Sequence, residues 1–493
     1  MKREPLSKVD TAWLRMEQPS NLMMITGVVG LDKNASYDRL IETIRQRFLA
    51  FRRFRQKAAI TPSGAFWEFD SEFEIRGHVR RVALPGLADQ AELEEYVSDL
   101  ASTALDPSRP LWQFHFVENF TEGPVVVMRI HHCYADGIAL VQVFLSLTDS
   151  SPQGNALTAN PEKWKRNRAK ESSIFQRLLE PAREGVDSLV HFMSRVIEEA
   201  VLLLNEPEKT GRYLTEMGEL VRELSNALTL PNDPKTLFKK KLGVRKRVAW
   251  AEPIPLEEVA AVSKALGCTV NDVLISAVTG ALRSYMLEEG ESLSASAEIR
   301  ATVPVNLRPL EHARELGNHF GLVFLTLPIS VANPLERLYC VNERMNELKA
   351  SKQAVMAFGL LAALGMSPSA VQKPALDLLS DKASMVLTNV PGPAEPLYLA
   401  GGKVQDMMFW VPQSGKLGVG VSILSYDRKV FFGLIVDRRL IADPGRIIQK
   451  FKPELEKLMY LAMMLPQETR PCSLAAESYL AQVLAELEEQ QAT

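Results

Sequence analysis

The sequence contains little cysteine and no long apolar run. Four cysteines occur among 493 residues, Cys133, Cys268, Cys340 and Cys472, without the spacing of a zinc site or a disulfide scaffold. We therefore expect free thiols in a reducing compartment. No apolar stretch reaches the roughly 18 residues that a membrane-spanning helix needs. The first ten residues (MKREPLSKVD) lack the apolar core of a signal peptide, so we expect none.

A strong charge of either sign is also absent. The formal net charge is −3, which gives no electrostatic reason to expect a nucleic-acid partner. The sequence has no G-x-S-x-G elbow, no phosphate-binding P-loop and no H-E-x-x-H pair. The sequence therefore gives no motif support for a serine hydrolase, a nucleotidase or a zinc hydrolase. With 46% hydrophobic and 24% charged residues, the composition is typical of a folded globular protein, and its length predicts more than one core.

Alternating strand and helix patterns predict an α/β fold with an interruption in the middle. Strands are predicted at 24–31, 112–118, 125–132, 299–307, 322–327, 385–389, 404–411, 418–426 and 430–437, and helices at 37–49, 91–104, 256–266, 270–286 and 444–458. We expect four units: an N-terminal half at 1–150, a helical connector or lid at 151–244, a C-terminal half at 245–465 and an acidic tail at 466–493. The first boundary is marked by a stretch rich in Ser, Pro, Gly and Asn at 149–160.

The most informative motif is H-H-x-x-x-D-G, which runs from His131 to Gly137. It follows a short β-branched run at 124–130 and precedes an apolar run of helical length at 138–147. Because side chains alternate along a strand, His131 and His132 cannot both face one site. One imidazole is then available as a general base for an alcohol, and the other packs.

Six further blocks accompany this motif along the chain. They are P-L-S-x-x-D (Pro5 to Asp10), R-P-L-W (Arg109 to Trp112), N-D (Asn271 and Asp272), P-V-N-L-R with G-N-H-F-G (Pro304 to Arg308 and Gly317 to Gly321) and T-N-V-P-G-P (Thr388 to Pro393). In this order, from about residue 5 to about residue 460, the chain resembles the CoA-dependent acyltransferases. It is most similar to the bacterial bifunctional wax ester synthase/acyl-CoA:diacylglycerol acyltransferase family. His319 stands at a variable position of its block, and we assign it no chemistry.

The resemblance implies two chloramphenicol-acetyltransferase-like halves, joined here by the helical connector, with a substrate tunnel between them. It also implies that His132 is the general base and His131 a packing and orienting neighbour. Asn271 would donate to the thioester oxyanion. Alternatively, Asn271 and Asp272 only cap the helix that begins after Thr269.

Asp136 and Gly137 permit two interpretations. Asp136 could complete a catalytic triad, but we favour a structural role, as the cap of the following helix and as the partner of Arg308 from the other half. Gly137 would let backbone and substrate approach closely because it has no Cβ atom. Cys133 lies between strand-end residues with no sign of activation, so we expect a packed thiol.

The implied activity is transfer of an acyl group from acyl-CoA to a long-chain alcohol or to diacylglycerol, giving wax ester or triacylglycerol. A thioester is already activated, so we expect no metal and no cofactor, acyl-CoA being a substrate. Two rivals remain: a condensation-type enzyme with the same H-H-x-x-x-D-G base, and a non-catalytic lipid-binding protein on the same scaffold.

One basic cluster is denser than any other part of the sequence. It comprises Lys235, Lys239, Lys240, Lys241, Arg245, Lys246 and Arg247. The cluster could bind CoA phosphates or an anionic membrane surface, or it could be a solvated linker. Because acceptor and product are nearly insoluble, we expect a cytoplasmic protein that associates peripherally with the inner membrane or with lipid droplets.

Overall fold

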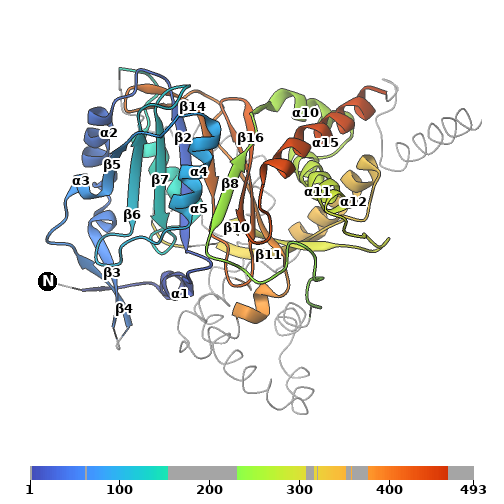
Figure 1. Cartoon of the computed structure of the whole chain (residues 1–493), viewed down its shortest axis with the longest axis horizontal. Helices are drawn as coiled ribbons and strands as arrows, with labels where there is room; N and C mark the ends of the chain where they lie inside the picture. The colour runs from blue at the N-terminus through green and yellow to red at the C-terminus, as the bar shows by residue number, and fades with distance from the viewer. Residues whose placement is uncertain are drawn as a thin grey trace, which may run out of the picture.

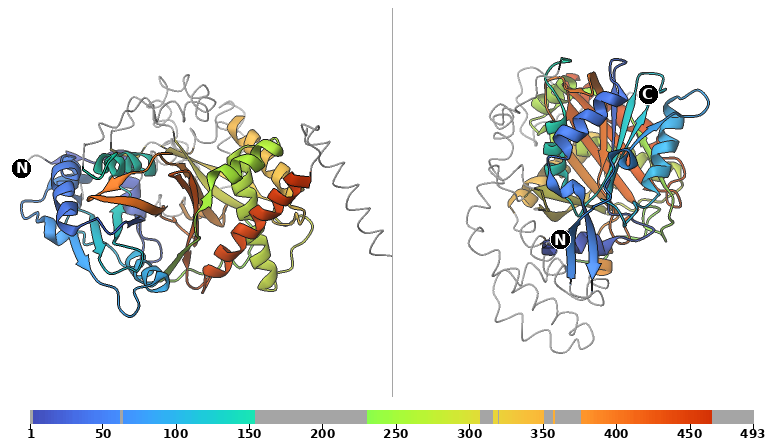
Figure 2. Two further views of the ribbon diagram at one scale, coloured as in Figure 1. Left: turned by 90° about the horizontal axis from the view of Figure 1, so that it is seen from above. Right: turned by 90° about the vertical axis from the view of Figure 1, so that its left-hand side faces the viewer.

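Two sheet-based halves lie side by side, as Figures 1 and 2 show. The computed structural model describes residues 3–61, 64–153, 230–306, 316–318, 320–350, 357 and 376–464. Helices cover the outer sides of the molecule and the two large sheets meet in its middle, which is clearest in the left view of Figure 2. The predicted α/β fold with two halves is confirmed.

The first half is built on a six-stranded sheet in the order β13-β14-β2-β7-β6-β5. Its strands are β2 (Met24–Leu31), β5 (Val79–Val82), β6 (Trp112–Val117), β7 (Val125–His131), β13 (Tyr398–Leu399) and β14 (Gly402–Trp410). Its helices are α1 (Lys8–Met16), α2 (Tyr37–Thr43), α3 (Ile75–His78), α4 (Gln90–Ala101) and α5 (Gly137–Leu147). All seven residues of β7 are buried, as its run of β-branched residues predicted.

The second half is built on a seven-stranded sheet in the order β11-β10-β12-β15-β16-β8, with β9 also paired to β16. Its strands are β8 (Lys246–Trp250), β9 (Ile254–Pro255), β10 (Ile299–Asn306), β11 (Phe320–Leu327), β12 (Met385–Pro391), β15 (Val419–Tyr426) and β16 (Lys429–Asp437). Its helices, α10 (Leu256–Ala265), α11 (Val270–Glu288), α12 (Pro334–Ala350) and α15 (Gly445–Met464), cover one face of the sheet (Figure 1).

Two strands from the C-terminal part of the chain belong to the sheet of the first half. Strand β14 comes late in the chain, yet it pairs antiparallel with β2 of the first sheet, from Val404 opposite Leu31 to Trp410 opposite Thr26. The predicted unit 245–465 therefore contributes two strands to the sheet of the other half. At the end of β14, Trp410 packs against Trp250 of β8 in the second sheet, with ring centroids 5.7 Å apart.

Helix α4 of the first half, with its C-cap residue, covers β8, the edge strand of the second sheet. The backbone amides of Lys246 and Val248 on β8 donate to the hydroxyls of Ser102 and Ser98, at 2.8 and 3.0 Å. Two side chains four residues apart on a helix are separated by about 6 Å along its axis, and two amides two residues apart on a strand are separated by roughly 6.6 Å. Hydroxyls spaced by four on the helix therefore match alternate amides of an edge strand, which would otherwise be open to pairing with another chain.

Some local structure differs from the prediction. The helix expected at 37–49 ends at Thr43 and continues as a π-helical turn, Ile44–Phe48. This wider turn places the guanidinium of Arg47 against Asp149 and the carbonyls that end α5. A small three-stranded sheet was not predicted. It has the order β1-β4-β3 and consists of β1 (Glu4–Pro5), β3 (Gln56–Thr61) and β4 (Gly64–Phe69). A 3-10 turn, Arg52–Arg55, comes directly before β3.

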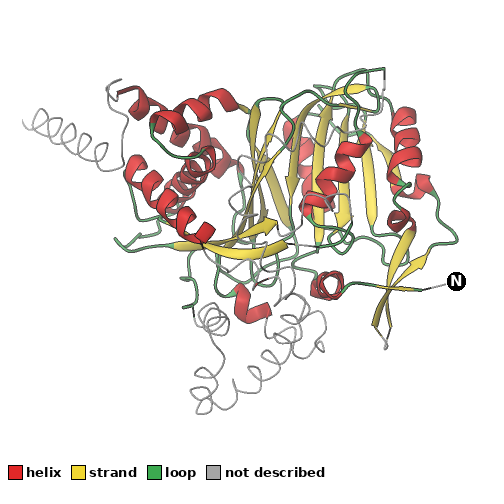
Figure 3. Cartoon of the chain, turned by 180° about the vertical axis from the view of Figure 1, so that it is seen from behind, coloured by secondary structure: helices red, strands yellow, loops and turns green. Residues whose placement is uncertain are grey.

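Two predicted units fall largely or wholly outside the described residues: the connector, of which 154–229 are not described, and the acidic tail. Within the described ranges, no single helix is both long and apolar enough to cross a bilayer. The bent pair α10 and α11 passes that test only when taken together, by length and composition alone. Figure 3 shows the same two halves from behind, with the helices of the second half gathered on its outer side.

Candidate active site

The H-H-x-x-x-D-G motif forms the connection between β7 and α5. Strand β7 ends at His131, and α5 begins at Gly137. Asp136 is the N-cap of α5, because its Oδ1 accepts from the backbone amide of Ala139 at 2.8 Å. The capping role expected of Asp136 is confirmed. Its expected partner Arg308 lies outside the described residues, so the ion pair between the halves stays a prediction.

His132 is buried within an aromatic and amide environment. Its backbone amide donates to the carbonyl of Met23 at 2.7 Å. The imidazole stacks on Trp13 of α1 with ring centroids 4.2 Å apart and an interplanar angle of 23°, and Phe320 of β11 lies 5.5 Å away. Burial lowers the pKa of His132 to about 4, although the charge of Asp136 acts in the opposite direction. The imidazole is therefore neutral near pH 7, which is the state that a general base requires.

His131 has different neighbours, as the alternation of side chains predicted. Its Nε2 lies 3.1 Å from a carboxylate oxygen of Glu17, and its Nδ1 accepts from the backbone amide of Cys133 at 3.1 Å. Burial opposes ionisation of Glu17, but the contacts with His131 and the amide of Met23 bring the pKa of that carboxyl below its usual value. These contacts fix the His131 ring beside the motif and leave it no visible part in proton transfer.

The segment 316–318 lies alongside the histidine loop. Gly317 forms a parallel bridge with Ala135, and its amide donates to the carbonyl of Tyr134 at 3.0 Å. The amide nitrogen of Asn318 donates to the carbonyl of His132 and to Oδ1 of Asp10, each at 2.8 Å. Three blocks that lie far apart in the sequence, P-L-S-x-x-D, H-H-x-x-x-D-G and G-N-H-F-G, therefore meet around His132.

The N-D motif lies at the start of α11. Thr269 and Asp272 form a reciprocal capping box, and Asp272 also accepts from the amide of Asn342 at 2.7 Å. Asn271 accepts from Nδ2 of Asn389 at 2.7 Å. Within the described ranges, no hydrogen bond joins Asn271 to His132. Asp272 is a structural cap, and the oxyanion role of Asn271 stays a prediction.

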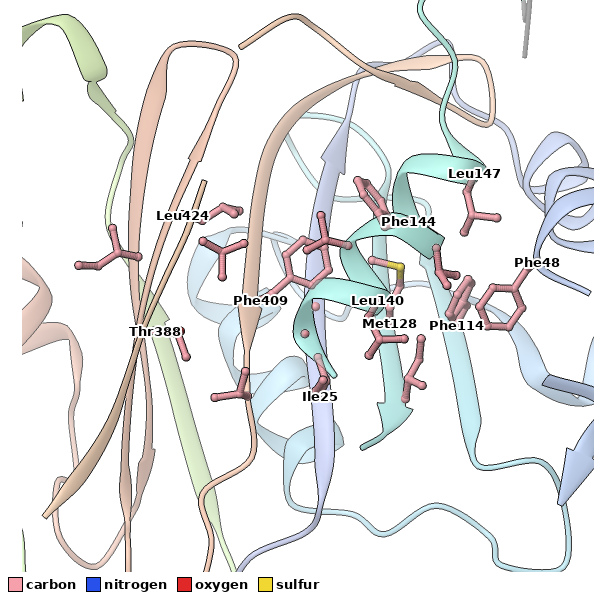
Figure 4. Close-up of a pocket in the computed structure, with 18 residues that line it drawn as sticks. Ile25, Phe48, Phe114, Met128, Leu140, Phe144, Leu147, Thr388, Phe409 and Leu424 are labelled. Atoms are coloured by element: carbon pink, nitrogen blue, oxygen red, sulfur yellow. The ribbon is translucent and has the colours of Figure 1, made fainter. Parts of the chain in front are cut away.

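An apolar cavity lies between the two sheets and α5 (Figure 4). It begins beside the histidine motif at Ile130 and Gly137 and continues along α5 to Leu147. A Cβ atom at Gly137 would meet no atom within 4 Å, so this glycine faces open space. On the second sheet, Thr388 and Val390 line the cavity. The residue between them, Asn389, points to the opposite face of β12, where it meets Asn271.

Two other sequence features have structural explanations. Burial raises the pKa of the Cys133 thiol, so this fully buried cysteine is protonated and not a nucleophile. Within the described ranges, no three histidine, cysteine or acidic side chains converge as metal ligands would.

The basic cluster is not one solvated surface. Lys239 donates to the carbonyls of Ser380, Asp381 and Ala383 at 3.3, 2.5 and 2.7 Å. Lys246 is buried and donates to Asn21 Oδ1 at 2.8 Å. The ammonium group of Lys239 therefore holds three backbone carbonyls in place, and this lysine does not belong to a solvated surface.

Sequence reasoning missed three residues that touch the histidine pair. Trp13 and Glu17 were not singled out, and Asn318 was recognised only as part of a block without a role. The spacing of Asp10 and Trp13, three residues apart, placed both on one face of a helix and could have shown that α1 presents both to a single site. The contact of Asn318 with His132 spans 186 residues, and no local pattern predicts such a contact.

Comparison with known proteins agrees with the geometry. The family model of the wax ester synthase/diacylglycerol acyltransferase catalytic domain matches residues 6–274, and that of the WS/DGAT C-terminal domain matches 316–459. A probable diacylglycerol O-acyltransferase, tgs1, of Mycobacterium tuberculosis (strain H37Rv) is 25% identical over 472 residues, which cover 93% of this chain and 96% of that protein.

Solved structures share the fold. The wax ester synthase/diacylglycerol acyltransferase from Marinobacter aquaeolei VT8 matches with a TM-score of 0.66 and 21% identity, covering 93% of this chain and 100% of that chain. The first condensation domain of the calcium-dependent antibiotic synthetase matches with a TM-score of 0.55 and 13% identity, covering 94% and 97%. The chain belongs to the wax ester synthase/diacylglycerol acyltransferase family and is an acyltransferase.

Proposed function

We propose that the protein transfers a long acyl chain from acyl-CoA to the hydroxyl group of a long-chain alcohol or of diacylglycerol, with His132 as the general base. The neutral imidazole takes the hydroxyl proton while the oxygen attacks the thioester carbonyl. The C–S bond then breaks, the imidazolium returns its proton to the leaving thiolate, and ester and free CoA result. The observation that carries the proposal is a buried, neutral His132 directly after β7, the strand whose Met128 and Ile130 line an apolar cavity.

The cavity supports an acyl chain as its occupant. Its described lining consists of apolar side chains and glycines, with Thr388 as the one hydroxyl. Each methylene group transferred from water into such a lining gains about 0.8 kcal/mol. The helix α5 extends about 15 Å from Gly137 to Leu147, so a chain that lies along it is buried over a length of that order.

Asn271 is proposed as a donor to the oxyanion of the tetrahedral intermediate. Its carbonyl oxygen is occupied by Asn389, which orients its NH₂ group away from that contact. The pair lies on the face of β12 opposite the cavity, near the carboxyl end of the strand. Replacing Asn271 by alanine is expected to lower kcat by about 10²–10³-fold if the donor acts in the transition state. A change confined to stability would leave only the capping interpretation.

The acceptor is tested with the purified full-length chain in mixed detergent micelles. Palmitoyl-CoA is supplied with hexadecanol, with dioleoylglycerol, or with neither, and both free thiol and labelled ester are followed. Ester formation with either acceptor supports the proposal, and the ratio of the two rates gives the preference. Thiol release that does not depend on any alcohol, or no release at all by a folded protein, would refute it.

The protein is proposed to collect its substrates at an anionic lipid surface. Lys235, Lys240, Lys241 and Arg245 are exposed, and Val244 beside them is 52% exposed. Each basic side chain near an anionic leaflet contributes about 1 kcal/mol, reduced by salt. Flotation with phosphatidylglycerol vesicles, compared with phosphatidylcholine vesicles, tests the proposal. Equal binding to both, or binding that does not respond to salt, would contradict it.

A further inference from the structure

Asn318 uses only its NH₂ group in the hydrogen bonds described above. The side chain is 3% exposed, and Nδ2 donates to Asp10 Oδ1 and to the carbonyl of His132. Its Oδ1 atom is buried and has no hydrogen-bond partner within the described part of the chain. The same holds for Nδ1 of His132. Asn318 Oδ1, an acceptor, and His132 Nδ1, a ring nitrogen that can carry a proton, therefore both lack a described partner, although the two residues are already joined by the hydrogen bond from Asn318 Nδ2 to the His132 carbonyl.

The orientation of the amide is determined by its neighbours. Asp10 is 6% exposed and presents a carboxylate oxygen, and the His132 backbone presents a carbonyl oxygen. If the amide were flipped, Oδ1 would face both oxygens without a proton between them. Nδ2 must therefore face Asp10, and Oδ1 is left for another donor. Asp10 is fixed in turn by α1, whose N-cap Ser7 accepts from the amide of Asp10 at 3.1 Å.

We propose that Asn318 is a positioning residue whose Oδ1 accepts the Nδ1–H of His132. This contact would select the tautomer in which Nε2 carries the lone pair that takes the hydroxyl proton. The inference rests on the proposed role of His132 as base. It gives the P-L-S-x-x-D and G-N-H-F-G blocks a shared role, because Asp10 holds the amide and the amide holds the imidazole.

An amide suits this position better than a carboxylate. The other groups around the ring are the backbone of His132 itself, His131 and Asp136 from the motif, Trp13 from α1 and Phe320 from β11. Asp136 is engaged as the cap of α5. A carboxylate at Nδ1 would favour the imidazolium, whereas a neutral acceptor orients the ring and leaves it unprotonated. The Asn318 side chain raises the pKa of His132 only as a minor influence, far smaller than the lowering by burial.

The tautomer can be measured without any assay of activity. In protein labelled with ¹⁵N-histidine, one of the seven histidines is assigned to His132 by its loss in His132→Gln. Wild type is expected to show a protonated Nδ1 and an unprotonated Nε2. Asn318→Leu keeps the approximate size but removes the acceptor, so the preference should be lost. Unchanged ¹⁵N shifts of His132 in Asn318→Leu would overturn the inference.

Asn21 offers a matched control. It is 2% exposed, and its Nδ2, like that of Asn318, donates to two oxygen atoms, here the backbone carbonyls of Gly415 and Leu417, at 2.8 and 3.0 Å. Asn21→Leu should lower thermal stability at least as much as Asn318→Leu does, because it also removes an acceptor of buried Lys246, but it should leave the tautomer of His132 unchanged. If both variants disturb the tautomer equally, a general loosening of the fold explains the effect and the inference fails.

A double substitution keeps the inference testable if Asn318→Leu does not fold. Asp10→Asn with Asn318→Asp reverses the donor and acceptor between the two residues and keeps their hydrogen bond, although the donor to the carbonyl of His132 is lost. It places a carboxylate at Nδ1, which should move the acid limb of kcat/KM to higher pH by about 1–3 units. A folded, active double variant with an unmoved limb would overturn the inference. Full activity of His132→Gln would instead overturn the proposed base, so the two failures are distinguishable.

Discussion

Narrowing the cavity along α5 should change which acyl chain the enzyme prefers. Val143 lies six residues past Gly137, about 9 Å along the helix, and lines the cavity. Val143→Phe adds bulk that displaces the equivalent of about four methylene groups. At about 0.8 kcal/mol each, the loss for a chain that passes this point is about 3 kcal/mol, or roughly 200-fold in kcat/KM. An octanoyl chain ends nearer Gly137 and should lose far less.

The assay is kcat/KM for CoA release with octanoyl-CoA and palmitoyl-CoA at a fixed concentration of hexadecanol. Gln142→Phe is the matched control, because it places a ring on the same helix at a position that does not line the cavity. The ratio of palmitoyl to octanoyl activity should fall in Val143→Phe and remain near wild type in the control. Equal losses for both substrates, in a variant with unchanged thermal stability, would show that the acyl chain does not occupy this cavity.

Three further predictions concern charge. Because burial lowers the pKa of His132 to about 4, the acid limb of kcat/KM should lie near that pH and not near the roughly 6.5 of free imidazole. The same pKa shift lowers the stability of the folded protein as pH falls from about 6.5 towards 4, because His132 of the unfolded chain then binds a proton that the folded chain does not. Circular dichroism at each pH must therefore show that the protein is still folded. Asp136→Ala should lower the free energy of unfolding by about 1 kcal/mol through the lost cap, measured by urea titration, with Asp136→Asn losing less. Lys239→Ala should lower the melting temperature, whereas Lys240→Ala with Lys241→Ala should leave it unchanged and weaken binding to anionic vesicles.

The sequence predicted the parts of the fold that depend on local pattern. The buried strand that ends at His131, the helix that begins at Gly137 and the capping role of Asp136 all follow from periodicity and from short-range hydrogen bonding. The order of motifs predicted the family. Most predicted elements agree with the observed ones to within one or two residues.

Several of the features that were not predicted depend on contacts between distant segments. Strand β14 has an ordinary strand pattern, and nothing in it reveals that it pairs with β2 of the other half. Lys239 belongs to a basic run, yet its ammonium is taken up by carbonyls about 140 residues away. The environment of His132 is assembled from α1, segment 316–318 and β11, and only the folded chain brings these together.

The most direct test of the account is the turnover of His132→Gln, which removes the base but retains a polar side chain of similar size. With palmitoyl-CoA and the preferred acceptor, kcat should fall by about 10²–10⁴-fold. KM for palmitoyl-CoA should change little, because the imidazole acts mainly in the transition state. A folded His132→Gln protein whose kcat stays within a few-fold of wild type would contradict the central claim that His132 is the general base.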